Sequence, residues 1–155
     1  MTPERLCEVL SYDQETGCLR WTVSRRAGNL AGYVDAGGYR QIKIDGRMYL
    51  AHRLAWLYVH RRWPVAEIDH MNGLRDDNRL ANLREVTHSE NLQNQRRARR
   101  DSKTGLLGTS PKGRKFQATI KLNGKARHLG YFDTAELAHE AYIDAKRRLH
   151  PAGTV

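Results

Sequence analysis

The chain has few of the features that mark secreted or membrane proteins. Of its 155 residues only Cys7 and Cys18 are cysteine, too few for a disulfide framework or a cysteine zinc cluster. No apolar run approaches the roughly 18 residues that a membrane helix needs, and no signal-peptide pattern opens the sequence. Apolar residues make up 39% and the mean hydropathy is −0.74, which allows only a modest core. We therefore expect a cytoplasmic protein with reduced thiols and no membrane partner.

Acidic residues are nearly missing from one stretch. Residues 96–127 hold 11 Lys and Arg against one acid, Asp101, and so carry the whole formal charge of +10. A polyanion such as double-stranded DNA is expected to dock there. A solvated linker is the alternative, but the strand-like and aromatic residues between the charges favour binding.

The N-terminal part predicts a small scaffold without chemistry of its own. Thr2 caps a helix that runs to about Leu10, and a strand follows over 18–23. Residues 38–50 form a hairpin around an Asp-Gly turn. Helical periodicity then predicts a helix over 52–60.

Carboxylate, imidazole and amide side chains are concentrated in the next part of the chain. The stretches are Glu67-Ile-Asp-His-Met-Asn-Gly73, Asn78-Arg-Leu-Ala-Asn-Leu-Arg84 and Ser89-Glu-Asn-Leu-Gln-Asn94. Strands over 66–70 and 83–87 enclose a polar loop. Thr87 or Ser89 caps a helix that continues through Arg100. This ββα unit is expected to bring Asn91 back towards Asp69.

These residue types suit phosphodiester hydrolysis. The carboxylate of Asp69 and the amide oxygen of Asn91 are hard ligands of the kind that Mg²⁺ prefers. A neutral His70 can take a proton from an attacking water near neutral pH. Taken singly, Asp69 and His70 could be a strand-end pair, Asn82 a turn residue and Asn91 an exposed helix amide. For His52, at a helix start, a structural hydrogen bond is favoured over catalysis.

Three motifs carry a family resemblance. Glu67-Ile-Asp-His70, Asn78-x-x-x-Asn82-Leu83 and Ser89-Glu-Asn91 resemble the HNH endonucleases, in particular the His-Asn-Asn branch of phage and homing enzymes. The resemblance covers residues 39–97, and a phage-encoded protein would act in the host cytoplasm. It implies His70 as catalytic general base, Asp69 and Asn91 as metal ligands, and Asn82 as the residue that holds the loop in shape.

The expected metal follows from the same comparison. Asn91 stands where many relatives of this family have His, which favours Mg²⁺ or Mn²⁺ over a His-rich metal site. The sequence has no CxxC pair, and this excludes the zinc-stapled version of the motif.

A second module is predicted at the C-terminus. Strands are expected over 106–110, 115–122 and 125–131, with an Asn123-Gly124 turn and then a helix that begins at 133–136 and is ended by Pro151. Alternation along the middle strand turns the apolar side chains to a core and leaves Lys115, Gln117, Thr119 and Lys121 outward.

This module resembles the AP2 DNA-binding domain. The matching residues are Phe116-x-Ala-x-Ile120, Leu129-Gly-Tyr-Phe-Asp-Thr-Ala-Glu136 and Ala141-Tyr142. The resemblance implies contacts to the DNA major groove from Arg114, Lys115, Gln117, Thr119, Lys121 and His128, although His128 stands where that family usually has an aromatic residue. Arg96, Arg97 and Arg100 are expected on phosphates. A support module with a solvated sheet is the alternative.

The sequence thus predicts an α+β protein in which a nuclease domain is followed by a DNA-binding domain. Residues 1–100 form an HNH nuclease domain with a ββα-metal core over 66–97, preceded by the hairpin and helix, and residues 101–155 form an AP2-like domain. We expect a metal-dependent DNA endonuclease, and a monomer is favoured over an oligomer although the sequence leaves the oligomeric state open. The alternative is a catalytically silent DNA-binding regulator on the same scaffold, while an RNA-binding role has little support because the basic sheet carries few aromatics.

Overall fold

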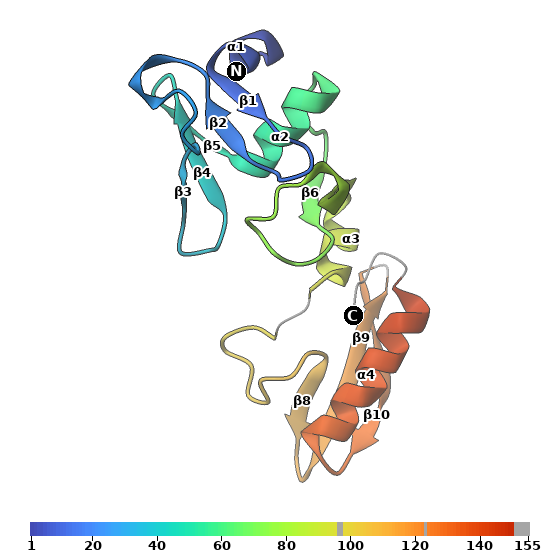
Figure 1. Ribbon diagram of the computed structural model, residues 1–155. Helices are drawn as coiled ribbons and strands as arrows, with labels where there is room; N and C mark the ends of the chain where they lie inside the picture. Colours follow the sequence, from blue (N-terminus) through green and yellow to red (C-terminus); the bar gives the residue numbers. More distant parts are fainter. Residues whose placement is uncertain (96–97, 123, 151–155) are drawn as a thin grey trace. The chain divides into compact units, whose positions relative to one another are not determined.

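The computed structural model describes residues 1–95, 98–122 and 124–150, and the chain divides into two compact units, Met1–Val86 and Thr87–Val155. The predicted phosphate contacts Arg96 and Arg97, the turn residue Asn123 and the helix stop Pro151 lie outside the described residues. Both units combine helices with small antiparallel sheets, so the predicted α+β class is confirmed (Figure 1). None of the described helices is long and apolar enough to cross a membrane.

The N-terminal unit contains two helices, three small antiparallel sheets and two short 3₁₀ turns. The sheets are β1–β2, β3–β4–β5 and β6–β7. In chain order the elements are α1 (Pro3–Val9), β1 (Leu10–Tyr12), β2 (Leu19–Trp21), η1 (Ser24–Arg26), β3 (Tyr33–Val34), β4 (Arg40–Ile44), β5 (Arg47–Leu50), α2 (Ala51–His60), β6 (Glu67–His70), η2 (Leu80–Asn82) and β7 (Leu83–Val86).

Local sequence signals set several of these elements. The Thr2 side chain accepts from the backbone N–H of Arg5 at 3.2 Å, as an N-cap does, and α1 ends one residue before the predicted Leu10. Asp45 and Gly46 both have positive φ, 48° and 82°, which is the backbone of a type I′ turn between β4 and β5. The predicted first helix, hairpin and second helix are therefore confirmed.

Helix α2 contributes to two apolar clusters. Leu54 and Leu57 are buried in a cluster with side chains from α1, β2 and β4. Ala55 and Trp56 pack instead with Ile68 of β6 and Leu83 of β7. Full burial of one such aliphatic side chain stabilises the fold by about 1.5–3 kcal/mol. The β6–β7 pair, which carries Asp69 and His70, is thus fixed to the rest of the unit through one helix.

The C-terminal unit contains one short helix and a three-stranded sheet backed by a long helix. Ile120 of β9 packs with Tyr142 and Ala145 of α4, on the sheet face opposite the outward side chains. The elements are α3 (His88–Gln93), β8 (Thr109–Lys112), β9 (Lys115–Leu122), β10 (Lys125–Phe132) and α4 (Ala135–Leu149), with β9 between β8 and β10.

The predicted helix through Arg100 is wrong. Thr87 makes a capping box with Glu90, which starts α3 firmly, but the helix ends at Gln93. Arg99 and Arg100 lie beyond it, outside any helix. Helix α3 buries none of its residues, and a six-residue helix without a packed face gains little from further turns.

The first strand of the C-terminal sheet begins later than predicted, at Thr109 rather than Leu106. Gly105 and Gly108 have positive φ, 68° and 71°, and turn the chain there. Leu107 packs beside the Ile120 and Tyr142 cluster instead of alternating along a strand. The apolar residues that suggested a strand therefore belong to a packed turn.

Gly108→Ala is predicted to destabilise the C-terminal unit. A Cβ at this position would overlap the ring of Tyr142, in addition to the strain of a positive φ. Gly113→Ala is the matched control, because Gly113 also has positive φ (63°) but open space around it. Urea unfolding should show a loss of stability for Gly108→Ala that exceeds the control by about 1–3 kcal/mol. Equal losses of stability would mean that the close approach to Tyr142 contributes nothing.

Candidate active site

Asp69 and His70 end strand β6, and both are buried. They lie opposite Arg84 and Leu83 of β7, and only 6% of Asp69 and 4% of His70 is exposed. The Asp69 Oδ2 accepts from Nε and Nη2 of Arg84 at 2.9 and 2.7 Å. This ion pair across the two strands compensates the burial of the carboxylate.

The His70 imidazole is held by a buried amide. Its Nε2 lies 3.3 Å from Oδ1 of Asn78, a residue of which 2% is exposed. Burial lowers the pKa of His70, against the opposing influence of Asn78 and of the charges of Asp69 and Asp77. The neutral imidazole is therefore favoured near pH 7, as a general base requires.

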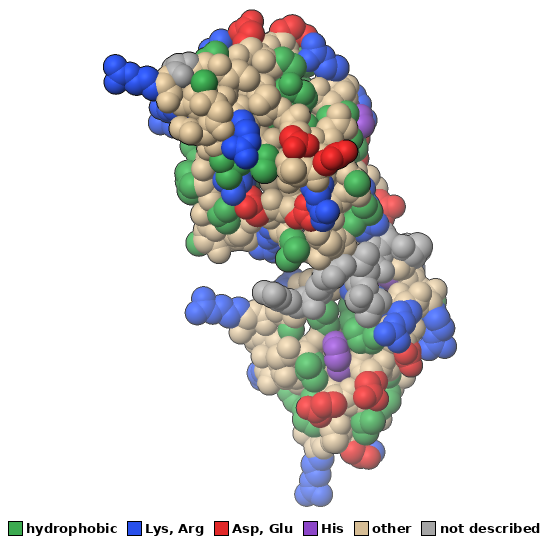
Figure 2. All heavy atoms as spheres, in the orientation of Figure 1, with side chains coloured by type: hydrophobic (Ala, Val, Ile, Leu, Met, Phe, Trp, Pro, Cys, Tyr) green, Lys and Arg blue, Asp and Glu red, His purple; other side chains and the backbone are tan. Residues whose placement is uncertain are grey.

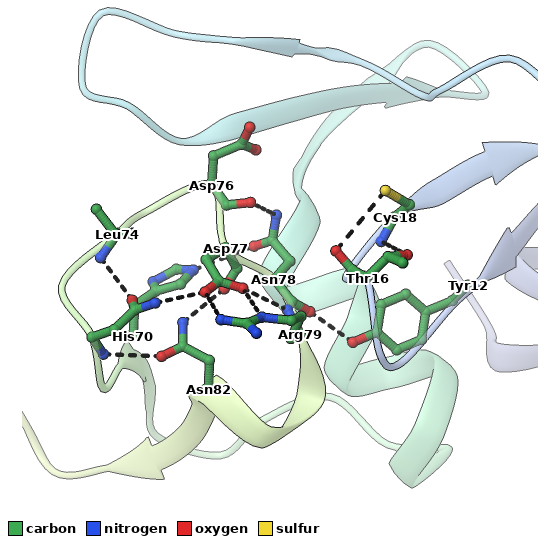
Figure 3. Close-up of polar contacts among 11 residues, drawn as sticks. Tyr12, Thr16, Cys18, His70, Leu74, Asp76, Asp77, Asn78, Arg79 and Asn82 are labelled. Carbon is green, nitrogen blue, oxygen red and sulfur yellow. Dashed lines mark hydrogen bonds and ion pairs between the residues drawn. The ribbon is translucent and has the colours of Figure 1, made fainter.

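Asn82 ties the two ends of the loop that follows β6 (Figure 3). Its Oδ1 accepts from the backbone N–H of Asn72 at 2.9 Å, and its Nδ2 donates to the backbone oxygen of Asp77 at 2.8 Å. Its own backbone oxygen accepts from Met71 at 2.9 Å. Three bonds from one residue hold residues 71–77 against η2.

Asp77 is the second polar centre of this loop. Its carboxylate accepts from Asn72 Nδ2 at 2.6 Å and from Arg79 Nε and Nη2 at 2.8 and 2.6 Å. The hydrogen bond from Arg79 is the main reason that the pKa of Asp77 falls to about 2. Asp77 is therefore fully ionised at neutral pH and fixes the loop from inside.

Residues far away in the sequence also hold this loop. The Tyr12 hydroxyl donates to the backbone oxygen of Asn78 at 2.7 Å. Arg40 donates to both carboxylate oxygens of Asp76 at 2.8 Å. Gly17 lies so close that a Cβ there would come within 2.5 Å of the Arg79 backbone nitrogen. The N-terminal scaffold therefore positions the segment that contacts His70.

Two more rings surround His70. The His52 ring lies edge-on to it at a centroid distance of 5.0 Å, and the Tyr39 ring is 6.1 Å away. Arg75 lies 4.9 Å above Tyr39 and donates to the backbone oxygen of Gly37 at 2.7 Å. Of His52 only 6% is exposed, and burial lowers its pKa to about 3.

Asn91 lies on α3, in the C-terminal unit, and is partly exposed. The structure brings Asp69, His70 and Asn82 together within the N-terminal unit, whereas the approach of Asn91 to Asp69 stays a prediction. Within the described residues, no group of three or more His, Cys, Asp and Glu could hold a metal ion. The predicted pair fits Mg²⁺ by its chemistry, since an ionised carboxylate and an amide oxygen are both hard ligands.

The predicted DNA contacts lie on the sheet of the C-terminal unit and beside it. Arg100, Arg114, Lys115, Lys121 and His128 are exposed, and Gln117 and Thr119 are partly buried. Gln117 and His128 share a hydrogen bond of 3.1 Å between β9 and β10. Lys115 pairs with Asp133 at 3.2 Å, an exposed contact that contributes little stability.

The segment around the site is similar to a known protein family. Residues 49–93 match the family model of the HNH endonuclease. This match supports the HNH nuclease family for the segment that contains Asp69, His70, Asn82 and Asn91. No curated protein and no solved structure matches the chain.

Several residues around the site carry roles that the sequence reasoning did not assign. Asn78 is the first residue of the motif Asn78-x-x-x-Asn82-Leu83, and Arg84 follows that motif directly, but the sequence assigned no role to either residue. Tyr39 lies within the predicted hairpin over 38–50, to which the sequence assigned no chemistry. The motif position of Asn78 was the one available signal, because the other contacts join residues far apart in the chain. The missed contacts are Asn78 and Tyr39 to His70, Arg84 to Asp69, and Arg40 to Asp76.

Acid is predicted to destabilise the N-terminal unit through His52. Its folded pKa of about 3 lies below the ordinary 6.5, so the unfolded chain binds the extra proton between these values. The stability contributed by the neutral ring is thus present above pH 6.5 and is lost as pH falls towards 3. The slope is at most about 1.4 kcal/mol per pH unit for one proton.

Urea unfolding between pH 4 and 7 tests this, with His52→Phe as the variant that keeps a ring but cannot take up a proton. His60→Phe, which changes an exposed histidine of the same helix, is the control. His52→Phe should flatten the dependence on pH and His60→Phe should not. An unchanged slope in His52→Phe would exclude His52 as the acid-sensitive group.

Proposed function

We propose that this protein is a metal-dependent DNA endonuclease of the HNH type. The observation that carries the proposal is the buried His70, neutral and held by Asn78, at the end of a strand that also bears Asp69. These residues lie within the segment that matches the HNH family model. A buried, neutral imidazole on the strand that also bears a carboxylate is typical of catalytic sites, and this supports the proposal.

His70 is the general base in this proposal. The ring accepts a proton from water, the water oxygen attacks the scissile phosphorus, and the bond to the 3′ oxygen breaks. Asn82 and Asp77 hold the loop that carries Asn78, and Asn78 contacts the ring, so the loop keeps the imidazole in one orientation.

Asp69 and Asn91 are the proposed holders of a divalent ion, Mg²⁺ or Mn²⁺. Such an ion supplies positive charge that offsets the charge of the scissile phosphate and the leaving oxygen. Arg84 is the partner that fixes one oxygen of Asp69, at 2.7 Å from its Nη2. The protein's contribution is therefore a carboxylate that is already oriented.

The C-terminal sheet is proposed to bind double-stranded DNA, as the AP2-like pattern implies. Lys115 and Lys121 are exposed at the two ends of the outward row of β9, whereas α4 covers the opposite face. The formal charge of +10 lies within residues 96–127, which include β8 and β9. An array of exposed cations on a sheet is the electrostatic pattern that phosphates require.

His70→Ala and Asn91→Ala are predicted to abolish cleavage of plasmid DNA in Mg²⁺, at least about a 100-fold loss, with DNA binding retained. His60→Ala, an exposed histidine of α2, is the control and should cut normally. EDTA should stop the wild-type reaction. Cutting at the wild-type rate by either site variant would refute the assignment, and binding without any cleavage by the wild type would favour the silent regulator.

Lys115→Ala with Lys121→Ala is predicted to weaken DNA binding and to flatten its salt dependence. The slope of log K against log salt should drop by about 0.9 for each DNA phosphate that the variant no longer neutralises. Arg147→Ala with Arg148→Ala removes the same charge from exposed positions on α4 and serves as the control. Equal slopes for the two double variants, measured by fluorescence anisotropy, would argue against the sheet face.

A further inference from the structure

The side-chain amide of Asn78 has a defined orientation, and this orientation determines which of its atoms faces His70. Its Nδ2 donates to the backbone oxygen of Asp76 at 3.1 Å, and its backbone N–H reaches the same oxygen at 3.1 Å. A flipped amide would set Oδ1 against that carbonyl oxygen, two acceptors facing each other. The oxygen of the Asn78 side chain therefore faces His70, within the loop drawn in Figure 3.

Asp76, whose backbone carbonyl orients Asn78, is held through its side chain by β4. Arg40 donates from Nε and Nη2 to the two carboxylate oxygens of Asp76, both at 2.8 Å. A bidentate pair of this kind fixes direction as well as distance. The Tyr12 hydroxyl adds a bond of 2.7 Å to the backbone oxygen of Asn78. Residues 76 and 78 are thus each held by another part of the N-terminal unit, and this fixes the backbone from which the Asn78 amide projects.

An amide oxygen is only an acceptor, so the ring atom that faces it must carry hydrogen. The ring nitrogen of His70 within hydrogen-bond distance of this oxygen is Nε2, at 3.3 Å. A neutral imidazole has one N–H, and if it lies on Nε2 then Nδ1 carries the lone pair. The hydrogen bond to Asn78 therefore selects between the two tautomers of the base.

We infer that Asn78 is a positioning residue that holds His70 as the Nε2–H tautomer, so that Nδ1 is the atom that takes the proton from water. The inference rests on the proposed nuclease function for its chemistry but not for the tautomer itself. In the step, the water O–H bond breaks, its proton moves to Nδ1, the oxygen bonds to phosphorus, and the 3′ oxygen leaves and is protonated by solvent. Asn78 touches neither substrate nor the transferred proton.

The tautomer is measured directly by ¹⁵N NMR of the full chain labelled at histidine, with the His70 signals identified by their loss in His70→Ala. The wild type should show a protonated Nε2 and an unprotonated Nδ1. A wild-type ring protonated at Nδ1 would overturn the inference, whether or not the protein cuts DNA. This measurement on the native chain remains decisive even if a variant fails to fold.

Three variants distinguish the effect of the Asn78 side-chain amide from the effect of the loop backbone. Asn78→Ala removes the acceptor and should give a mixture of tautomers, with kcat down at least about tenfold and KM for DNA unchanged. Asn78→Asp keeps an acceptor for Nε2 but loses the donor to the Asp76 backbone oxygen, so it should retain the Nε2–H form with a lower free energy of unfolding. Tyr12→Phe loosens the Asn78 backbone but leaves its amide, and should keep the Nε2–H form.

The two proposals fail in different ways. A pure Nε2–H form that persists in folded Asn78→Ala would overturn the role of Asn78, because another group would then set the tautomer. A wild-type protein with the Nε2–H tautomer and no cleavage in Mg²⁺ would overturn the nuclease function while supporting the tautomer. Circular dichroism of each variant establishes that the compared proteins are folded.

Discussion

Burial of the His70 ring is the constraint on which the rest of the N-terminal unit depends. An imidazole in a residue with 4% exposure gains little solvation from water, so its N–H group needs a protein partner. The β6–β7 pair alone could not provide this, because two short strands expose both faces. Helix α2 covers one face through Ala55 and Trp56, and the loop up to Asn78 provides the polar partner.

The loop after β6 is rigid although it has almost no regular structure. Asn82, Asp77 and Asn72 bond mainly to backbone groups or to each other, and this replaces the hydrogen bonds that a helix or a strand would supply. Arg40 and Tyr12 then attach the loop to the scaffold. A conformation held at so many points explains how a polar loop can orient a single ring.

Local signals predicted the elements that local physics determines. The Thr2 cap, the Asp45-Gly46 turn and the alternation along β9 depend on neighbours in the sequence, and all three are confirmed. The helix through Arg100 was wrong, because helix length depends on packing that a sequence pattern does not show. The residue types alone identified Asp69 and His70 as candidate site residues. The contacts of Asn78 with His70 and of Arg40 with Asp76 could be found only in the folded structure.

The two units use their cations differently. In the N-terminal unit Arg40, Arg62, Arg79 and Arg84 each pair with an acid, and Figure 2 shows basic and acidic side chains close together over this unit. Those arginines stabilise loops and strands. On β9 Lys121 instead projects from an exposed sheet face within the stretch that carries the net charge. Charge that is balanced within a fold contributes little long-range attraction, so the proposed DNA affinity is expected to depend mainly on cations of the second unit.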